Sequence, residues 1–99
     1  MKYDYTIDNF LECLKIGHEI EFTFCGKWFF VQPDYKFNKN KIKEGKCDRR
    51  YILYQCESYA DNNAKILLSG TLDEIISFPL NKQMTIKTNF DKFSLYCMF

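Results

Sequence analysis

The alternation of apolar and polar residues is strongest in residues 19–31. This stretch reads Glu-Ile-Glu-Phe-Thr-Phe, then Cys-Gly, then Lys-Trp-Phe-Phe-Val. Two runs rich in aromatic and β-branched residues that flank a two-residue connection predict a β-hairpin. Gly26, in the second place of the connection, supplies the positive φ that such a tight turn needs. Cys25 suits the first place less well than Asn or Asp would.

The length of this connection decides which side chains face the core. Successive residues alternate between the two faces of a strand, and opposed residues share a face. With Cys25 and Gly26 as the loop, the predicted core face carries Ile20, Phe22, Phe24, Phe29 and Val31. The other face then carries Glu19, Glu21, Thr23, Trp28, Phe30 and Gln32. A three-residue loop would move Trp28 and Phe30 to the core side. The two-residue loop is favoured because it groups the apolar residues of both strands.

A helix is predicted before the hairpin by its cap and its apolar stripe. Thr6 is a favourable N-cap residue. Apolar residues follow it at the spacing of one helix face, namely Ile7, Phe10, Leu11 and Leu14. Gly17 stands where helices commonly end in a left-handed residue. The pattern therefore predicts a helix over residues 7–16 that covers the sheet.

A second helix is predicted over residues 72–77. Thr71 and Glu74 are spaced as a capping box, in which each side chain satisfies a backbone donor of the other residue. The apolar residues that follow form a short stripe, made of Leu72, Ile75 and Ile76. Pro79 ends the helix soon afterwards.

The remaining elements of the second half are predicted from alternation and spacing. They are strands over residues 51–58 and 65–69 joined by a turn at 61–63, a short helix near 85–92, and a final strand over 95–99. We therefore predict an α+β fold in which four or five mostly antiparallel strands form one sheet with two or three short helices packed on it. At 99 residues, the chain is expected to be a single domain spanning 1–99.

Two segments resemble a family of small proteins. The first ends a helix as Phe-Leu-x-x-Leu-x-x-Gly and continues as a Glu-Ile-Glu-Phe strand and a Gly-Lys-x-Phe-x-Val return strand. The second is Ser-Gly-Thr-Leu-Asp-Glu-Ile-Ile-Ser-Phe at residues 69–78. Both are similar to stretches of a group of uncharacterised proteins from Gram-positive bacteria and their phages. The resemblance covers about half of the chain and implies a fold and a genomic setting, but no established activity. Cys25 departs from the group, which usually has Asn or Asp there.

Residues 33–50 have a different composition from the rest of the chain. Seven basic and three acidic side chains give this stretch a net charge of +4, whereas the whole protein carries +1. We predict a long basic loop, because long connections in compact domains tend to be functional or mobile. Its basic residues are candidates for contacts with phosphate or an acidic partner: Lys36, Lys39, Lys41, Lys43, Lys46, Arg49 and Arg50. Tyr35 and Phe37 are candidates for stacking on nucleic-acid bases. A solvated loop that keeps the protein soluble is the simpler interpretation.

The second face of the hairpin offers the other candidate surface. Trp28 and Phe30 lie among polar residues there, so either another segment covers them or they anchor a partner protein. Glu19 and Glu21 share that face and could join such a contact. They are equally explained as a solvated face that discourages pairing of an exposed strand edge.

The sequence gives little support for catalysis or metal binding. Its five cysteines show no CxxC pair, namely Cys13, Cys25, Cys47, Cys56 and Cys97, and His18 is the single histidine. We therefore predict free thiols, no metal site and no cofactor. A thiol–imidazole enzyme lacks a recognisable orienting group, so we predict that the protein is not an enzyme. The absence of a signal-like or membrane-spanning apolar run predicts a cytoplasmic protein with no membrane contact.

We therefore expect a non-enzymatic protein that acts by binding another protein. The resemblance to phage-borne proteins implies a sharper form, an inhibitor of a host enzyme or defence system comparable to an anti-CRISPR protein. Nucleic-acid binding through residues 36–50 is the alternative, and a bacterial housekeeping role is the second alternative. Pairing of an exposed edge strand with a second copy leaves a homodimer open.

Overall fold

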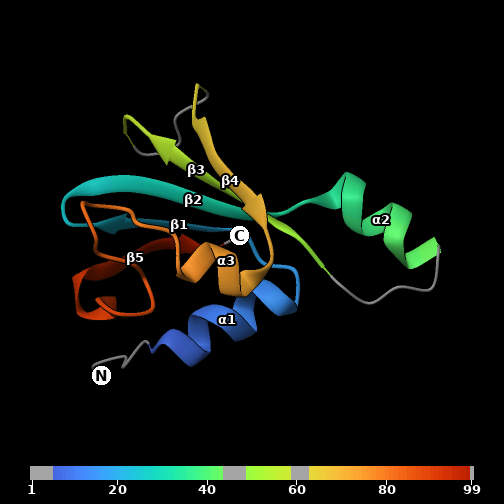
Figure 1. The fold of residues 1–99 in the computed structure, drawn as a ribbon, viewed down its shortest axis with the longest axis horizontal. Coiled ribbons are helices and arrows are strands. Elements are labelled where there is room, and N and C mark those ends of the chain that lie inside the picture. The colour runs from blue at the N-terminus through green and yellow to red at the C-terminus, as the bar shows by residue number, and fades with distance from the viewer. Residues whose placement is uncertain (1–5, 44–48, 59–62, 99) are drawn as a thin grey trace.

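The computed structural model describes residues 6–43, 49–58 and 63–98, and the side chains of all of these except 40–43 and 96–98. In this part of the chain five strands form one antiparallel sheet in the order β4-β3-β2-β1-β5 (Figure 1). The strands are β1 (Ile20–Phe24), β2 (Lys27–Pro33), β3 (Tyr51–Cys56), β4 (Lys65–Gly70) and β5 (Phe93–Met98). The helices are α1 (Ile7–Lys15), α2 (Tyr35–Lys43), α3 (Leu72–Ile76) and the single 3₁₀ turn η1 (Phe90–Lys92). The predicted α+β class is confirmed.

The central hairpin has the predicted register. Ile20 pairs with Val31 and Phe24 pairs with Lys27, so the loop is Cys25 and Gly26 alone. Both loop residues adopt positive φ, 52° at Cys25 and 77° at Gly26. A type I′ turn requires this conformation at both of its central residues. The turn therefore fixes which side of the sheet each side chain of β1 and β2 faces.

The core lies on one side of the sheet. The predicted core residues of the hairpin are all buried: Ile20, Phe22, Phe24, Phe29 and Val31. They pack with side chains of α1 and α3, among them Phe10, Leu14, Ile75 and Ile76. Figure 1 shows α1 and α3 on the same side of the sheet. Aromatic rings meet at the centre, where Phe22 contacts Phe10 edge to face at 5.9 Å and stacks on Phe93 at 4.7 Å.

Local capping chemistry positions the two covering helices as predicted. The Thr6 hydroxyl accepts a hydrogen bond from the Asn9 N–H, and the Asn9 side chain accepts one from the Thr6 N–H. Helix α1 ends before Gly17, which has a φ of 101°. Thr71 and Glu74 form the predicted capping box at α3. Each box satisfies backbone donors that the helix leaves unpaired at its N-terminus.

Two predictions of local structure are wrong. Residues 35–43 of the predicted loop form helix α2, which extends beyond one end of the sheet (Figure 1). The helix predicted near residues 85–92 is not formed. Residues 86–88 form a turn instead, and the 3₁₀ turn η1 follows it. The Thr85 hydroxyl accepts from the Thr88 N–H, and such side-chain bonds compete with helical hydrogen bonds. In addition, the Lys87 N–H donates to the Ile76 carbonyl across the fold.

Candidate functional site

The side of the sheet opposite α1 and α3 carries a band of aromatic and aliphatic side chains. On β2 and β3, Phe30 lies opposite Tyr54, and their ring centroids are 6.0 Å apart. Trp28 lies opposite Cys56, two residue pairs further toward the hairpin turn and therefore on the same face. Ile66 on β4 pairs with Tyr54 and extends the band toward the sheet edge. We call this surface the open face and define it by Trp28, Phe30, Ile52, Tyr54 and Ile66.

The open face is only partly shielded from solvent. Trp28, Phe30, Ile52 and Tyr54 are half-buried, and Ile66 is 59% exposed. Figure 1 shows none of the helices of the described chain lying across this side of the sheet. Trp28 and Phe30, predicted as contact candidates, therefore both lie on an accessible surface.

Polar groups border the open face at the end of the sheet where β2 stops. The Gln32 amide nitrogen donates to the Tyr54 hydroxyl at 3.1 Å. Burial raises the pKa of Tyr54, and the nearby negative charges of Asp34 and Glu19 raise it further. Tyr54 therefore remains a neutral phenol at physiological pH, with a hydroxyl suited to hydrogen bonding at the border of the band.

The two glutamates predicted beside Trp28 and Phe30 have different environments. Glu21 is only 3% exposed, so the predictions that it contacts a partner or belongs to a solvated face are wrong. The reason is that β1 lies inside the sheet, with Glu21 opposite Phe30 on β2 and opposite Cys97 on β5. For the same reason, protection of an exposed edge cannot be the role of Glu21, because the edge strands are β4 and β5.

Glu19 lies just before β1 and is half-buried. It acts on Tyr35, whose pKa is raised by burial, by the negative charge of Glu19 and by a hydrogen bond with the Glu19 side chain. Glu19 therefore contributes negative charge close to the polar border of the open face.

The structure describes the side chains of four of the seven predicted basic residues. Lys36 and Lys39 lie on α2 and are exposed, as are Arg49 and Arg50 just before β3. Lys41 and Lys43 lie within α2, although their side chains are outside the described part, and Lys46 is outside it altogether. Exposed basic side chains are thus gathered around α2 and the start of β3, at one end of the sheet (Figure 1).

Helix α2 is attached to the sheet by a short hydrogen-bond network. An Asp34 carboxylate oxygen accepts from the Phe37 N–H at 3.2 Å and so caps the helix. The Asn38 amide donates to the Arg50 carbonyl at 3.0 Å, and its oxygen accepts from the Arg50 N–H at 2.7 Å. The first turn of α2 is therefore tied to the residue before β3, and the prediction of an irregular loop at this point is wrong.

The two predicted stacking residues, Tyr35 and Phe37, differ in how accessible their rings are. Phe37 is half-buried, with the Arg50 guanidinium 4.8 Å from its ring centroid. This cation–π contact already occupies one face of the ring. Tyr35, in contrast, is 55% exposed. Tyr35 is thus the more accessible ring of the two.

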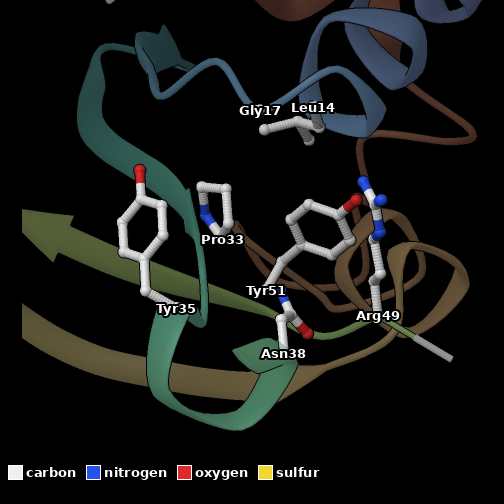
Figure 2. A pocket seen from close by; sticks show the side chains of 7 residues that line it. All are labelled: Leu14, Gly17, Pro33, Tyr35, Asn38, Arg49 and Tyr51. Carbon is white, nitrogen blue, oxygen red and sulfur yellow. The ribbon is translucent and has the colours of Figure 1, made fainter. Parts of the chain in front are cut away.

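A small hollow of about 210 Å³ lies where α1 ends and β3 begins (Figure 2). Its lining comes from α1, β2, α2, β3 and the segments that follow α1 and precede β3: Leu14, Gly17, Pro33, Tyr35, Asn38, Arg49 and Tyr51. Sequence reasoning missed this site, because its residues are separated along the chain and share no motif. It likewise missed Tyr54 and Ile52 on the open face, although residues two apart in the predicted strand over 51–58 lie on one side of that strand.

Among the residues that the structure describes, no three His, Cys, Asp or Glu side chains gather in a way that could hold a metal ion. Within the same residues, Cys13, Cys25 and Cys56 form no disulfide. No described helix has the length and apolar character needed to cross a lipid bilayer.

Comparison with known proteins gives no further assignment. No protein-family model matches the chain, and neither does any curated protein or solved structure.

Proposed function

We propose that the protein acts by binding another protein through the open face. The observation that carries this proposal is a half-exposed aromatic and aliphatic band on the side of the sheet opposite α1 and α3. Contiguous apolar patches on a protein surface mark sites of interaction. Trp and Tyr residues are also enriched among those that contribute most to binding energy at protein interfaces.

The chemistry of the band fits a protein partner better than a small ligand. The side chains come from three adjacent strands and form a broad surface, whereas small-molecule sites are concave. Tyr54 offers a hydroxyl, and Gln32 and Glu19 lie beside it. An apolar centre with a polar rim is the usual anatomy of a protein interface.

A sharper form of the proposal is that the protein inhibits a host enzyme or defence system on behalf of a phage or mobile element. Support for this form comes from the resemblance to proteins of Gram-positive bacteria and their phages. The open face would then cover a working surface of the target without any catalytic group of its own.

The test is affinity capture from a nuclease-treated lysate with three forms of the full-length protein. The first is wild type, the second carries Trp28→Thr with Phe30→Thr, and the third carries Lys36→Gln with Lys39→Gln as a matched control. We expect wild type and the lysine variant to retain the same protein, and the open-face variant to lose it. Threonine is chosen because it favours strands.

Loss of binding must be separated from loss of folding. Circular dichroism and urea unfolding of each variant provide that control. Ile66→Thr supplies a milder second change, because this side chain is already 59% exposed in the folded protein. Undiminished capture by a folded open-face variant would reject the open face as the binding surface.

Nucleic-acid binding through α2 is the second candidate function. The observation in its favour is that Lys36, Lys39, Arg49 and Arg50 are all exposed at the same end of the sheet as Tyr35. Such binding would weaken steeply as salt concentration rises, because cationic side chains displace counterions from phosphates. Titration of a fluorescent single-stranded oligonucleotide at several salt concentrations tests this. Affinity that does not change with salt, or with Lys36→Gln and Lys39→Gln, would reject it.

A further inference from the structure

The hollow at the end of α1 brings one cation and one buried hydroxyl together. Arg49 and Tyr51 both line it, together with the apolar side chains of Leu14 and Pro33. Figure 2 shows the Tyr51 hydroxyl on the same side as the Arg49 guanidinium. Burial raises the pKa of Tyr51, and the positive charge of Arg49 opposes part of that rise.

The Tyr51 hydroxyl has no protein partner in the described part of the chain. The residue is 3% exposed, yet none of the hydrogen bonds among the described residues involves its hydroxyl. A buried hydroxyl without a partner is costly, and most buried polar groups have one. Because the pKa of Tyr51 is raised, the hydroxyl keeps its proton at neutral pH and is available as a donor.

Arg49 is held in position but keeps most of its donors. One guanidinium nitrogen, Nη1, donates to the Lys15 carbonyl at 3.0 Å. An arginine side chain carries five N–H donors, so the others remain for a ligand. Among the described residues, no carboxylate forms an ion pair with Arg49. A planar guanidinium is well matched to a carboxylate, which it can bind through two parallel hydrogen bonds.

The end of α1 repels an anion less strongly than a helix C-terminus with unpaired carbonyl groups would. A helix C-terminus carries partial negative charge on its unpaired carbonyl groups. Here each of the last four carbonyls, those of residues 12–15, accepts a hydrogen bond. The first three accept from the backbone N–H groups of Ile16, His18 and Gly17 respectively, and the fourth accepts from the Arg49 guanidinium. The last turn of α1 therefore presents paired acceptors, and Arg49 places a positive charge against them.

The other polar residues of the hollow are already engaged. The Asn38 amide is paired with the Arg50 backbone through both its nitrogen and its oxygen. Burial raises the pKa of Tyr35, and the nearby Glu19 carboxylate raises it further. The donors directed at a ligand are thus Arg49 and Tyr51, and the rest of the wall is apolar or occupied. Arg49 is the charged side chain among the lining residues, and a single guanidinium beside apolar walls suits a monoanion with a short apolar group.

We propose that this hollow binds the carboxylate group of a small monoanion or of a peptide C-terminus, with Arg49 and Tyr51 as its two donors. The volume of about 210 Å³ is below the range of about 300–1,000 Å³ that is typical of sites for drug-sized ligands. The site therefore accepts a group of a few carbon atoms. It is separate from the open face and does not depend on the proposed function.

The test is a titration of the full-length protein followed by NMR of the Arg49 side-chain N–H groups and the Tyr51 ring. Butyrate represents a free small acid, and N-acetylleucine represents a peptide C-terminus. Butyramide and N-acetylleucinamide are the matched neutral controls. Ionic strength is kept constant, and each probe is taken to about 100 mM because ligands of this size bind weakly.

We expect saturable shifts with either carboxylate and none with the neutral amides. A larger affinity for N-acetylleucine would assign the site to chain ends, and equal affinities would assign it to small acids. Arg49→Gln should weaken binding by about tenfold or more, because it removes a charged donor. Tyr51→Phe should weaken it by about fivefold while leaving the aromatic ring in place. Arg50→Gln is the matched control and should have no effect, since Arg50 does not line the hollow.

Three results would overturn the proposal. The first is the absence of saturable shifts with both carboxylates. The second is equal binding of the neutral amides, which would indicate an apolar hollow without anion recognition. The third is tighter binding of inorganic phosphate than of either carboxylate. Arg49→Lys separates the role of charge from that of the planar group, and it should recover part of the affinity that Arg49→Gln loses.

Discussion

Both sides of the sheet carry aromatic side chains, but only the side covered by α1 and α3 buries them almost completely. On the covered side, Phe22 and Phe29 are stacked with centroids 5.6 Å apart and are almost completely buried. On the open face, Phe30 occupies the neighbouring position of the same strand as Phe29, yet it is half-buried, with its ring centroid 6.0 Å from that of Tyr54. The difference comes from the helices, since α1 and α3 pack on one side of the sheet only (Figure 1).

This comparison shows which apolar residues the fold itself explains. Burial of the covered side supplies the hydrophobic stabilisation that folding needs. The open face keeps part of its apolar surface in contact with water, most of all at Ile66, which is 59% exposed. The proposed binding partner would cover this surface.

The largest expected difference between the two sides is in stability. Phe22→Ala should lower the free energy of unfolding by about 3–5 kcal/mol, because it leaves a cavity among closely packed rings. Phe30→Ala should cost only about 1–2 kcal/mol, because its side chain is partly exposed before the change. Urea unfolding of both variants measures this. Equal losses would show that the open face is as much a part of the core as the covered side.

The hairpin turn should have the next largest effect, since it determines which strand residues reach each side. Gly26 has a φ of 77° and its position for a Cβ atom is free of contacts, so Gly26→Ala tests the backbone alone. We expect a loss of about 1–2 kcal/mol, which is the cost of a left-handed conformation for a residue with a Cβ. Lys27→Ala is the control, because Lys27 is exposed and has ordinary φ. A loss no larger than that of the control would mean that the turn does not fix the register.

The smallest effect concerns the cap that holds α3 on the covered side. Hydrogen bonds from the Thr71 backbone and hydroxyl hold the pKa of Glu74 below its ordinary value. A depressed folded-state pKa means that this stabilisation is present above the unfolded pKa and is lost as pH falls through the folded value. The free energy of unfolding, measured from about pH 6 down to about pH 3, should therefore decline less in Glu74→Gln than in wild type. Parallel pH profiles for the two proteins would contradict this.

Much of the fold could be predicted because its signals are local. Gly26 indicated the length of the hairpin loop, and that length determined every pairing between β1 and β2. Thr6 and Thr71 indicated where α1 and α3 begin, because their capping partners lie only three residues away. Such features depend on neighbours in the sequence and need no knowledge of distant segments.

Features that depend on distant segments were not predicted. Glu21 is buried because β5, more than seventy positions further along the chain, pairs with β1. Helix α2 lacks a strong apolar stripe, so its periodicity gave no signal, although Asp34 was an available N-cap residue. The hollow likewise required Arg49 to reach the carbonyl of Lys15, and no sequence pattern encodes that contact.

The most direct test of the central claim is cross-saturation NMR of the full-length protein bound to the partner that affinity capture identifies. We expect saturation of the partner to reduce the signals of the open face, defined by Trp28, Phe30, Ile52, Tyr54 and Ile66. Signals of Lys36 and Lys39 on α2 should remain unchanged. Reduction confined to α2, with the open face unaffected, would contradict the account and favour the basic end of the sheet as the binding surface.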